Sequence, residues 1–318
     1  MAPKETEKER GAALLLRLVR TCVHLAYLAG KAVRAVQRDR EQSGSAALGA
    51  SLKDATDTRS YLTTADLRAQ KVIVDGLRQA FPRLVLVGEE EENGDSAAEA
   101  LADPGSWYPY AVDDDKAGFY RPVSLTERDL PVEYGSVELT ELVVFIDPVD
   151  GTREFVEGRL DSVQTLIGIA WRGRPIAGVV GLPFHHHEVG VIPTFAVLPP
   201  SKAAGAILHG VVGVGLFGLR HPLDDEDEPT SKKPRQQETE VVAPAWRRSH
   251  APAQLIAATS KSVKESILSE AHAVIGGEPL IAGGCGNKIV RLCTGQADVT
   301  LFNLGTCLLQ KKLRRSSS

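Results

Sequence analysis

Two aspartates three residues apart are the strongest chemical signal in the sequence. Asp147 and Asp150 lie in the run Asp-Pro-Val-Asp-Gly-Thr, directly after the apolar segment 142–146. Pro148 lacks an amide donor and cannot continue a central strand, so we expect the chain to turn there and to present both carboxylates to a cleft. Two nearby carboxylates repel each other unless a cation lies between them, and all-oxygen ligation suits magnesium. A surface Asp-Pro turn with an aspartate cap is the simpler alternative.

The residues that follow this run could hold a phosphate group. Gly151 lets the backbone approach a ligand closely, and residues 152–156 can begin a helix whose free amide groups attract anions. One carboxylate shared between two ions about 4 Å apart is the arrangement used in two-metal phosphoryl transfer. The run therefore indicates phosphate chemistry assisted by magnesium.

Two further acidic motifs come earlier in the chain. Gly88-Glu89-Glu90 directly follows a predicted short strand at 84–87, and Thr63-Thr64-Ala65-Asp66 opens a predicted helix. Taken singly, the first is explained by a solvated acidic loop and the second by a helix N-cap with an acidic residue in the first turn. Because of their order and spacing relative to Asp147, the two motifs together indicate a functional site more strongly than either motif does alone.

The elements that must position these motifs alternate along the chain. Apolar residues recur at helical spacing over residues 11–40, and we expect this first helix to pack on a domain core. Polar stretches without a clear period read as a surface insertion (93–138) and a solvated linker (221–237). The alternation of strands and helices predicts layered α/β packing. We expect helices over 11–40, 65–80 and 262–275, a helix start at 288–294, and strands over 142–146, 163–171, 175–182 and 254–259.

Composition limits the class of partner. The 318 residues are 43% hydrophobic and 25% charged, with a formal net charge of −4, so no global basic field would hold a nucleic acid polymer or an acidic membrane. A small anionic substrate would have to be captured locally, by metal ions or a few aimed donors. We see no transmembrane helix or signal peptide, and the four scattered cysteines fit reduced thiols, so we expect a cytoplasmic protein.

The three motifs, in this order, resemble the inositol-monophosphatase superfamily. Within it, the chain is most similar to the 3'(2'),5'-bisphosphate nucleotidases, and the similarity runs from about residue 14 to residue 302. The blocks that carry this second similarity are Ala65-Asp66 with Ala69-Gln70, residues 142–158 with Asp161-Ser162-Val163, residues 166–170, residues 176–179, and Gly283-Gly284-Cys285-Gly286-Asn287-Lys288.

The resemblance implies an α/β fold, a layered αβαβα sandwich with the metal site between two halves. We expect an α+β half at 1–195 that carries the metal-binding motifs. The α/β half would occupy 196–318, with a polar loop at 221–240.

The resemblance also assigns roles by motif position. Glu89, Asp147 and the Val149 carbonyl would hold one magnesium ion, and Asp147 with Asp150 would hold a second, within a set of two or three ions. Asp66 and Thr152 match the pair that orients and deprotonates the attacking water.

The implied substrate is adenosine 3',5'-bisphosphate, cleaved to AMP and phosphate. Relatives also accept 3'-phosphoadenylyl sulfate and, in some members, inositol 1,4-bisphosphate. The transferred phosphate would lie on the amides of Gly151 and Thr152, while Ser260, Gly284 and Lys288 match positions that contact the nucleotide. The alternatives are an inositol polyphosphate 1-phosphatase or inositol monophosphatase, and a nucleotide-binding variant without catalysis. The oligomeric state is not indicated.

The sequence departs from the pattern of these relatives in three places. Val263 stands where they have a histidine near the nucleotide. Tyr61-Leu62 precedes Thr63-Thr64, where relatives often have more polar residues. Beyond Gly305-Thr306 they continue into a Trp-Asp motif that supplies an aspartate to the second metal. Here the chain reads Cys307-Leu308-Leu309 and ends at Ser318. We therefore expect an α/β half that lacks its last part, and low or absent activity. The histidines at 185–187 alternate in direction if they lie on a strand, so we do not expect them to form a metal site.

Overall fold

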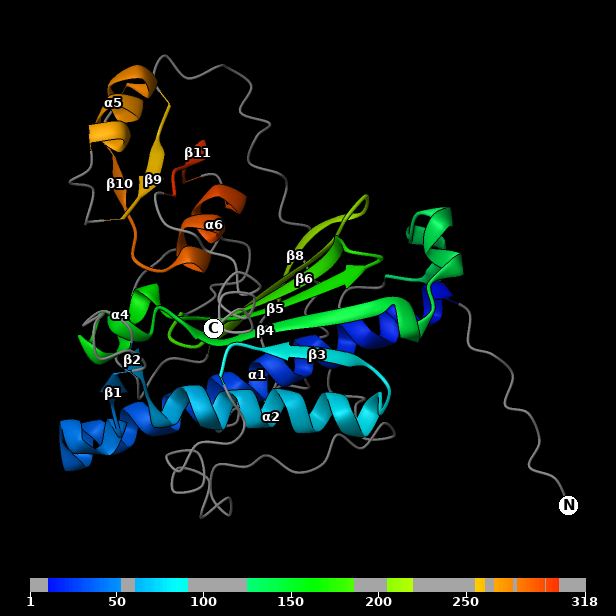
Figure 1. Cartoon of the computed structure of the whole chain (residues 1–318), viewed down its shortest axis with the longest axis horizontal. Helices are drawn as coiled ribbons and strands as arrows, with labels where there is room; N and C mark the ends of the chain where they lie inside the picture. The colour runs from blue at the N-terminus through cyan, green and yellow to red at the C-terminus, as the bar shows by residue number, and fades with distance from the viewer. Residues whose placement is uncertain are drawn as a thin grey trace, which may run out of the picture.

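A computed structural model describes the chain in several stretches, and its largest unit is a sheet covered by two long helices. The smaller unit consists of a second sheet with two helices (Figure 1). The layered α/β architecture expected from the sequence is confirmed. The described residues are 11–52, 61–90, 125–185, 205–219, 255–260, 266–276, 279–294 and 296–302.

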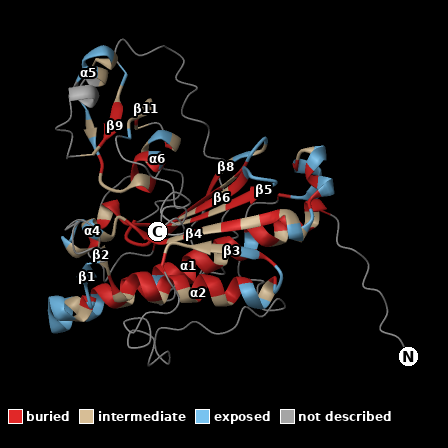
Figure 2. Ribbon diagram, viewed as in Figure 1, coloured by how far each residue is buried: buried red, intermediate tan, exposed pale blue. Residues whose placement is uncertain are grey.

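The first helix, α1 (Gly11–Ser43), is apolar along most of its length and is buried as predicted. It is long and apolar enough to cross a membrane, but 78% of its most apolar window is buried inside the protein. It packs against α2 (Thr64–Ala80) and against one face of the large sheet (Figures 1 and 2). A core helix accounts for this composition without a membrane.

Helix α2 begins and ends where its sequence predicts. Thr63 caps it, because the backbone amide and the hydroxyl of Thr63 both donate to Asp66 Oδ2, at 2.8 and 2.6 Å. Its last residue, Ala80, precedes the Phe81-Pro82 pair that ends the helix.

The large sheet has six strands in the order β3-β4-β5-β6-β7-β8. Only the β3–β4 pair within it is parallel, so the carboxyl ends of these two strands lie at the same edge. Strands β7 and β8 belong to this sheet although they follow residue 196, so it extends beyond the α+β half expected to end at residue 195. The strands are β3 (Val85–Gly88), β4 (Leu142–Asp150), β5 (Gln164–Trp171), β6 (Arg174–Leu182), β7 (Ala206–Val211) and β8 (Gly215–Leu219).

The expectation that the strand stops before Pro148 is wrong. Strand β4 continues to Asp150, and its pairing with β5 shifts register between Asp147 and Asp150. An irregularity of this kind leaves residues unpaired in the ladder, so the missing amide of proline breaks no ladder hydrogen bond. The Thr165 hydroxyl instead donates to the Pro148 carbonyl at 2.9 Å.

The smaller sheet is parallel, with the order β10-β9-β11. It stands with α5 and α6 next to the end of β4 that carries the acidic run (Figure 1). Helix α6 begins at Cys285, three residues before the helix start predicted at Lys288. The elements here are β9 (Ala257–Thr259), α5 (Ser266–Ile275), β10 (Leu280–Ile281), α6 (Cys285–Cys293) and β11 (Val299–Thr300).

Short elements complete the described fold. A 3-10 turn follows α1, and the described part of the expected surface insertion contains more of them. Tyr134 in this part is buried, and its hydroxyl donates to the Val212 carbonyl at 3.2 Å, so the segment is partly built into the core. These elements are η1 (Ser45–Leu48), β1 (Ser51–Leu52), β2 (Tyr61–Leu62), η3 (Glu127–Asp129), η4 (Val132–Ser136), η5 (Leu139–Glu141), α4 (Thr152–Val156) and η6 (Leu160–Ser162).

The packing of α1 on α2 generates a stability prediction at Gly76. A Cβ added to Gly76 would lie 2.3 Å from Leu25 Cδ2, inside a core where Leu25 is fully buried. Gly76→Ala should therefore lower the free energy of unfolding by up to about 2 kcal/mol, because overpacking outweighs the gain in helix propensity. Urea unfolding monitored by circular dichroism measures the change.

Gly135→Ala is the matched control, since its added Cβ meets nothing within 4 Å. The double variant Leu25→Ala/Gly76→Ala should be less destabilised than the sum of the single variants, because the shortened residue 25 relieves the clash. Strict additivity would contradict the proposed contact.

Candidate active site

Asp66 and Thr152 are 86 residues apart in sequence and meet in the structure. The Thr152 hydroxyl lies 3.0 Å from Asp66 Oδ1 and 2.9 Å from the Val149 carbonyl oxygen, and its single proton can be donated to either of these acceptors. Asp66 is fully buried, and its other oxygen accepts the two hydrogen bonds from Thr63. The helix cap thus holds the carboxylate in a fixed rotamer, with one oxygen aimed at the threonine.

Glu89 and Asp147 are brought together by the parallel pairing of β3 with β4. Gly88 is paired with Ile146, and the Glu89 amide donates to the Ile146 carbonyl at 2.9 Å. Glu89 directly follows Gly88, and Asp147 directly follows Ile146. The two acidic side chains therefore lie at the same edge of the sheet.

The electrostatics of this pair are unfavourable for two negative charges. Burial raises the pKa of Asp147 well above its usual range, and the charges of Glu89 and Asp150 and a hydrogen bond to Glu89 raise it further. Oδ1 of Asp147 is buried and has no hydrogen-bond partner among the described residues. A buried, unpartnered carboxylate oxygen beside a second carboxyl group is a position that either a proton or a cation would stabilise.

The donor set at this position fits magnesium. It consists of the carboxylates of Glu89 and Asp147 with the neighbouring Val149 carbonyl, all of them oxygen ligands. No cluster of three or more His, Cys, Asp or Glu side chains suited to a metal is found in the part of the chain that the structure describes. Magnesium commonly binds one or two carboxylates and keeps several waters, so a two-carboxylate set does not exclude it.

Asp150 lies at the same strand end but faces helix α6. Its two carboxylate oxygens accept hydrogen bonds from the amides of Cys285, at 3.0 Å, and Gly286, at 2.8 Å. Burial raises the pKa of Asp150 to about 6, although these two amides and the charge of Lys288 act in the opposite direction. Asp150 therefore joins the acidic run to the first turn of α6, a role that the sequence did not reveal.

Gly151 makes the sharp turn from β4 into α4. Its φ of 86° lies in the left-handed region, and an added Cβ would come within 2.4 Å of the Ser162 carbonyl oxygen. Only glycine combines this conformation with this close approach. The turn places Thr152 as the first residue of α4, where its hydroxyl can reach Asp66.

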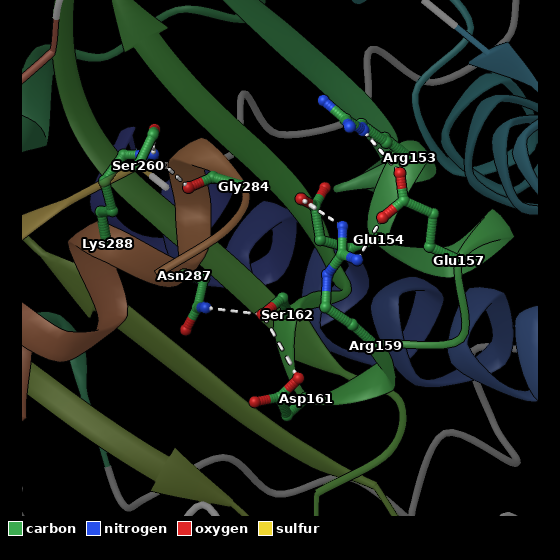
Figure 3. A network of polar contacts seen from close by, with 10 residues as sticks. All are labelled: Arg153, Glu154, Glu157, Arg159, Asp161, Ser162, Ser260, Gly284, Asn287 and Lys288. Carbon is green, nitrogen blue, oxygen red and sulfur yellow. Dashed lines mark hydrogen bonds and ion pairs between the residues drawn. The ribbon is translucent and has the colours of Figure 1, made fainter. Parts of the chain in front are cut away.

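Ser260, Gly284 and Lys288 also converge (Figure 3). Nζ of Lys288 donates to Ser260 Oγ at 3.0 Å and to the Gly284 carbonyl at 2.7 Å. Lys288 is only 4% exposed, and burial lowers the pKa of its ammonium group. Since an ammonium group has three donors, the two internal bonds leave one for a ligand.

Two residues at the site were given no role from the sequence. Asn287 is fully buried, and its amide donates to Ser162 Oγ at 3.1 Å, which helps to dock α6 onto the loop before β5 (Figure 3). Gln70 in α2 bonds both backbone groups of Glu90. Both residues lie inside the sequence blocks that carry the resemblance, and that was the available signal.

Several predicted features lie wholly or partly outside the described residues: Val263, His186, His187, the polar loop at 221–240 and the chain from Cys307 onward. His185 is described and buried just beyond β6. Burial lowers the pKa of His185 to about 4.

Comparison with known proteins finds similarity along most of the chain. A sequence model of the inositol monophosphatase family matches residues 18–307. The human 3'(2'),5'-bisphosphate nucleotidase 1 is 30% identical over 295 residues, which cover 92% of this chain and 77% of that protein. The protein of the same name from Dictyostelium discoideum is 28% identical over 296 residues, covering 91% and 77%.

A solved structure supports the fold. CysQ from Bacteroides thetaiotaomicron, described as a bacterial member of the inositol monophosphatase family, superposes with a TM-score of 0.51 at 18% sequence identity. The match covers 89% of this chain and 79% of that one.

The raised pKa values generate a prediction about pH and magnesium. A carboxyl group whose folded-state pKa is raised contributes stability below its unfolded pKa, and this contribution is lost as pH rises through the folded value. For Asp150 this window runs from its ordinary pKa of 3.8 to about 6, and the pKa of Asp147 is shifted in the same direction. Metal-free protein should therefore lose stability across this window, and magnesium should restore it at higher pH.

The measurement is the Tm in magnesium minus the Tm in EDTA, at pH 5.0 and pH 7.5. The difference should be larger at pH 7.5, on the order of a few degrees for a chain of this size. Asp147→Asn should raise the metal-free Tm at pH 7.5 and remove the magnesium response. Asp75→Asn, which alters a surface ion pair with Lys71, should leave both unchanged. A magnesium effect independent of pH would argue against these carboxylates as ligands.

Proposed function

Because the chain belongs to the inositol monophosphatase family, we propose that it is a magnesium-dependent phosphatase that removes the 3'-phosphate of adenosine 3',5'-bisphosphate, giving AMP and phosphate. The observation that carries the proposal is the hydrogen bond between Thr152 and Asp66 beside the Glu89–Asp147 carboxyl pair. Relatives named 3'(2'),5'-bisphosphate nucleotidase 1, which match over about nine-tenths of the chain, support the choice of substrate.

In this proposal Glu89, Asp147 and the Val149 carbonyl would hold a first magnesium ion, and Asp147 with Asp150 would hold a second. When bound, magnesium supplies Lewis-acid activation of the phosphate and of the attacking water. The number of ions depends on Asp150, because both of its oxygens already accept amide hydrogen bonds from α6 and retain only their other lone pairs for a metal.

Asp66 acts as general base through Thr152. The Thr152 hydroxyl donates to Asp66 Oδ1, so its oxygen lone pairs can accept a hydrogen bond from the attacking water. As the water attacks phosphorus, its proton passes to Thr152 and the threonine proton passes to Asp66. The bond between phosphorus and the 3'-oxygen breaks, and the 3'-oxygen leaves as an alkoxide that takes a proton from solvent to give the 3'-hydroxyl of AMP. The two hydrogen bonds from Thr63 stabilise the charged form of Asp66 before the reaction.

Phosphate binding is assigned to backbone amides and one lysine. The amides of Gly151 and Thr152 lie at the turn into α4 and would bind the transferred phosphate. Ser260, Gly284 and Lys288 form one cluster near α6 and would bind the second phosphate or the nucleoside. We include 3'-phosphoadenylyl sulfate and inositol 1,4-bisphosphate as further substrates, since both carry a second anionic group in addition to the scissile phosphate.

Substrate choice is tested by phosphate release from purified full-length chain. Adenosine 3',5'-bisphosphate should release phosphate in magnesium and not in EDTA, at a higher kcat/KM than inositol 1-phosphate or inositol 1,4-bisphosphate. Preference for an inositol phosphate would favour an inositol phosphatase, and nucleotide binding by calorimetry without hydrolysis would favour a non-catalytic binding protein.

The proton relay is tested at Thr152. Thr152→Val removes the hydroxyl and keeps the shape, so kcat should fall by about 10²–10⁴-fold, the usual contribution of general base catalysis. Thr152→Ser keeps the hydroxyl and should retain activity within about tenfold, the cost of a side chain that is less restricted at χ1. Near-normal kcat in the valine variant would remove Thr152 from the mechanism.

A further inference from the structure

We infer that Gln70 is a positioning residue that fixes the direction of the Glu89 carboxylate toward Asp147; its effect on magnesium rests on the proposed function. Gln70 lies on α2 and is 5% exposed. Its Oε1 accepts a hydrogen bond from the Glu90 amide at 2.9 Å, and its Nε2 donates to the Glu90 carbonyl at 2.8 Å. Both polar atoms of the Gln70 side chain are thus hydrogen-bonded to the backbone of Glu90.

These bonds complete the restraint of Glu89 on both sides. The peptide group before Glu89 is held by β4, because the Glu89 amide donates to the Ile146 carbonyl at 2.9 Å. The peptide group after it contains the Glu90 amide, which is held by Gln70. With both flanking peptide planes fixed, the Cα–Cβ direction of Glu89 is also fixed, although the segment is a bend just beyond the end of β3.

Gly88 provides independent support for this contact. A Cβ added at Gly88 would lie 2.5 Å from Gln70 Oε1 and 2.9 Å from its Cδ. The glutamine amide therefore packs directly onto the backbone just before Glu89, at a distance that only glycine permits at that position. The Gly-Glu-Glu motif and the glutamine form one unit.

Helix α2 also connects this unit to the proposed base. Asp66 and Gln70 are four residues apart and lie on the same face of the helix. Asp66 contacts Thr152, and Gln70 contacts Glu90. One helix thus fixes the position of the proposed base, Asp66, relative to the proposed metal ligand, Glu89. Gln70 connects the helix to Glu89 through its hydrogen bonds to the Glu90 backbone.

The test compares two variants with a matched control. Gln70→Glu keeps the size of the side chain but loses the donor to the Glu90 carbonyl, and Gln70→Leu loses both hydrogen bonds. Gln37→Leu is the control, because Gln37 is a helix glutamine that is 6% exposed and bonds to Glu41 rather than to the motif. Magnesium affinity is measured by calorimetry on the full chain, and phosphate release is measured over a magnesium titration.

Both Gln70 variants should bind magnesium about 10–100-fold more weakly, the usual effect of removing a group that orients a metal ligand. At saturating magnesium, kcat and the KM for the nucleotide should return close to the wild-type values, because the reacting groups are unchanged. Gln37→Leu should match the wild type in magnesium affinity. A purely structural role would instead lower the Tm without moving the magnesium midpoint.

Failure of the proposed function and failure of the inference about Gln70 give different results. Wild-type chain that binds no magnesium would overturn both the proposed function and this inference. Wild-type binding with equal affinity in folded Gln70 variants would overturn the inference alone. Loss of the folded state in both variants would also overturn it, since Gln70 would then support the whole fold rather than one ligand.

Discussion

The repulsion between carboxyl groups at the edge of the large sheet is the constraint on which the rest of the site depends. Glu89 and Asp147 are half-buried and share a hydrogen bond, and the charge of Asp150 also acts on Asp147. No isolated segment would hold these groups together, because their proximity costs free energy. Three features of the fold hold the acidic groups in place: the parallel pairing of β3 with β4, the capped helix α2, and the first turn of α6. A site that stores this repulsion is prepared to bind a cation.

The sequence predicted the local part of this arrangement well. The helices predicted over 11–40 and 65–80, the strands predicted over 163–171 and 175–182, and the positions of the acidic motifs at strand or helix ends are found close to where periodicity and capping placed them. The pairing of Asp66 with Thr152 followed only from resemblance, since no local pattern relates residues 86 positions apart.

The sequence failed where a tertiary contact overrides a local rule. A proline in a strand normally ends it, but the register shift between Asp147 and Asp150 accommodates Pro148, and Thr165 bonds its carbonyl. The attachment of Asp150 to α6 depends on amides 135 and 136 residues further along the chain. Backbone amides carry no residue-specific signal, so a sequence does not reveal which ones a carboxylate will reach. Gln70 was overlooked for the same reason, because its partners are the backbone atoms of Glu90.

The attachment of Asp150 has a consequence for how the two sheets cooperate. The first turn of α6 contains Gly286 and Lys288, and it is held by Asp150 on one side and by the Asn287–Ser162 bond on the other. Lys288 in turn holds Ser260 at the end of β9. A charge change at Asp150, by protonation or by a cation, therefore acts directly on the helix that carries the proposed nucleotide contacts. Because the chain is negatively charged overall, this local coupling, rather than long-range attraction, is the physical route by which an anionic substrate and a cation would favour each other's binding.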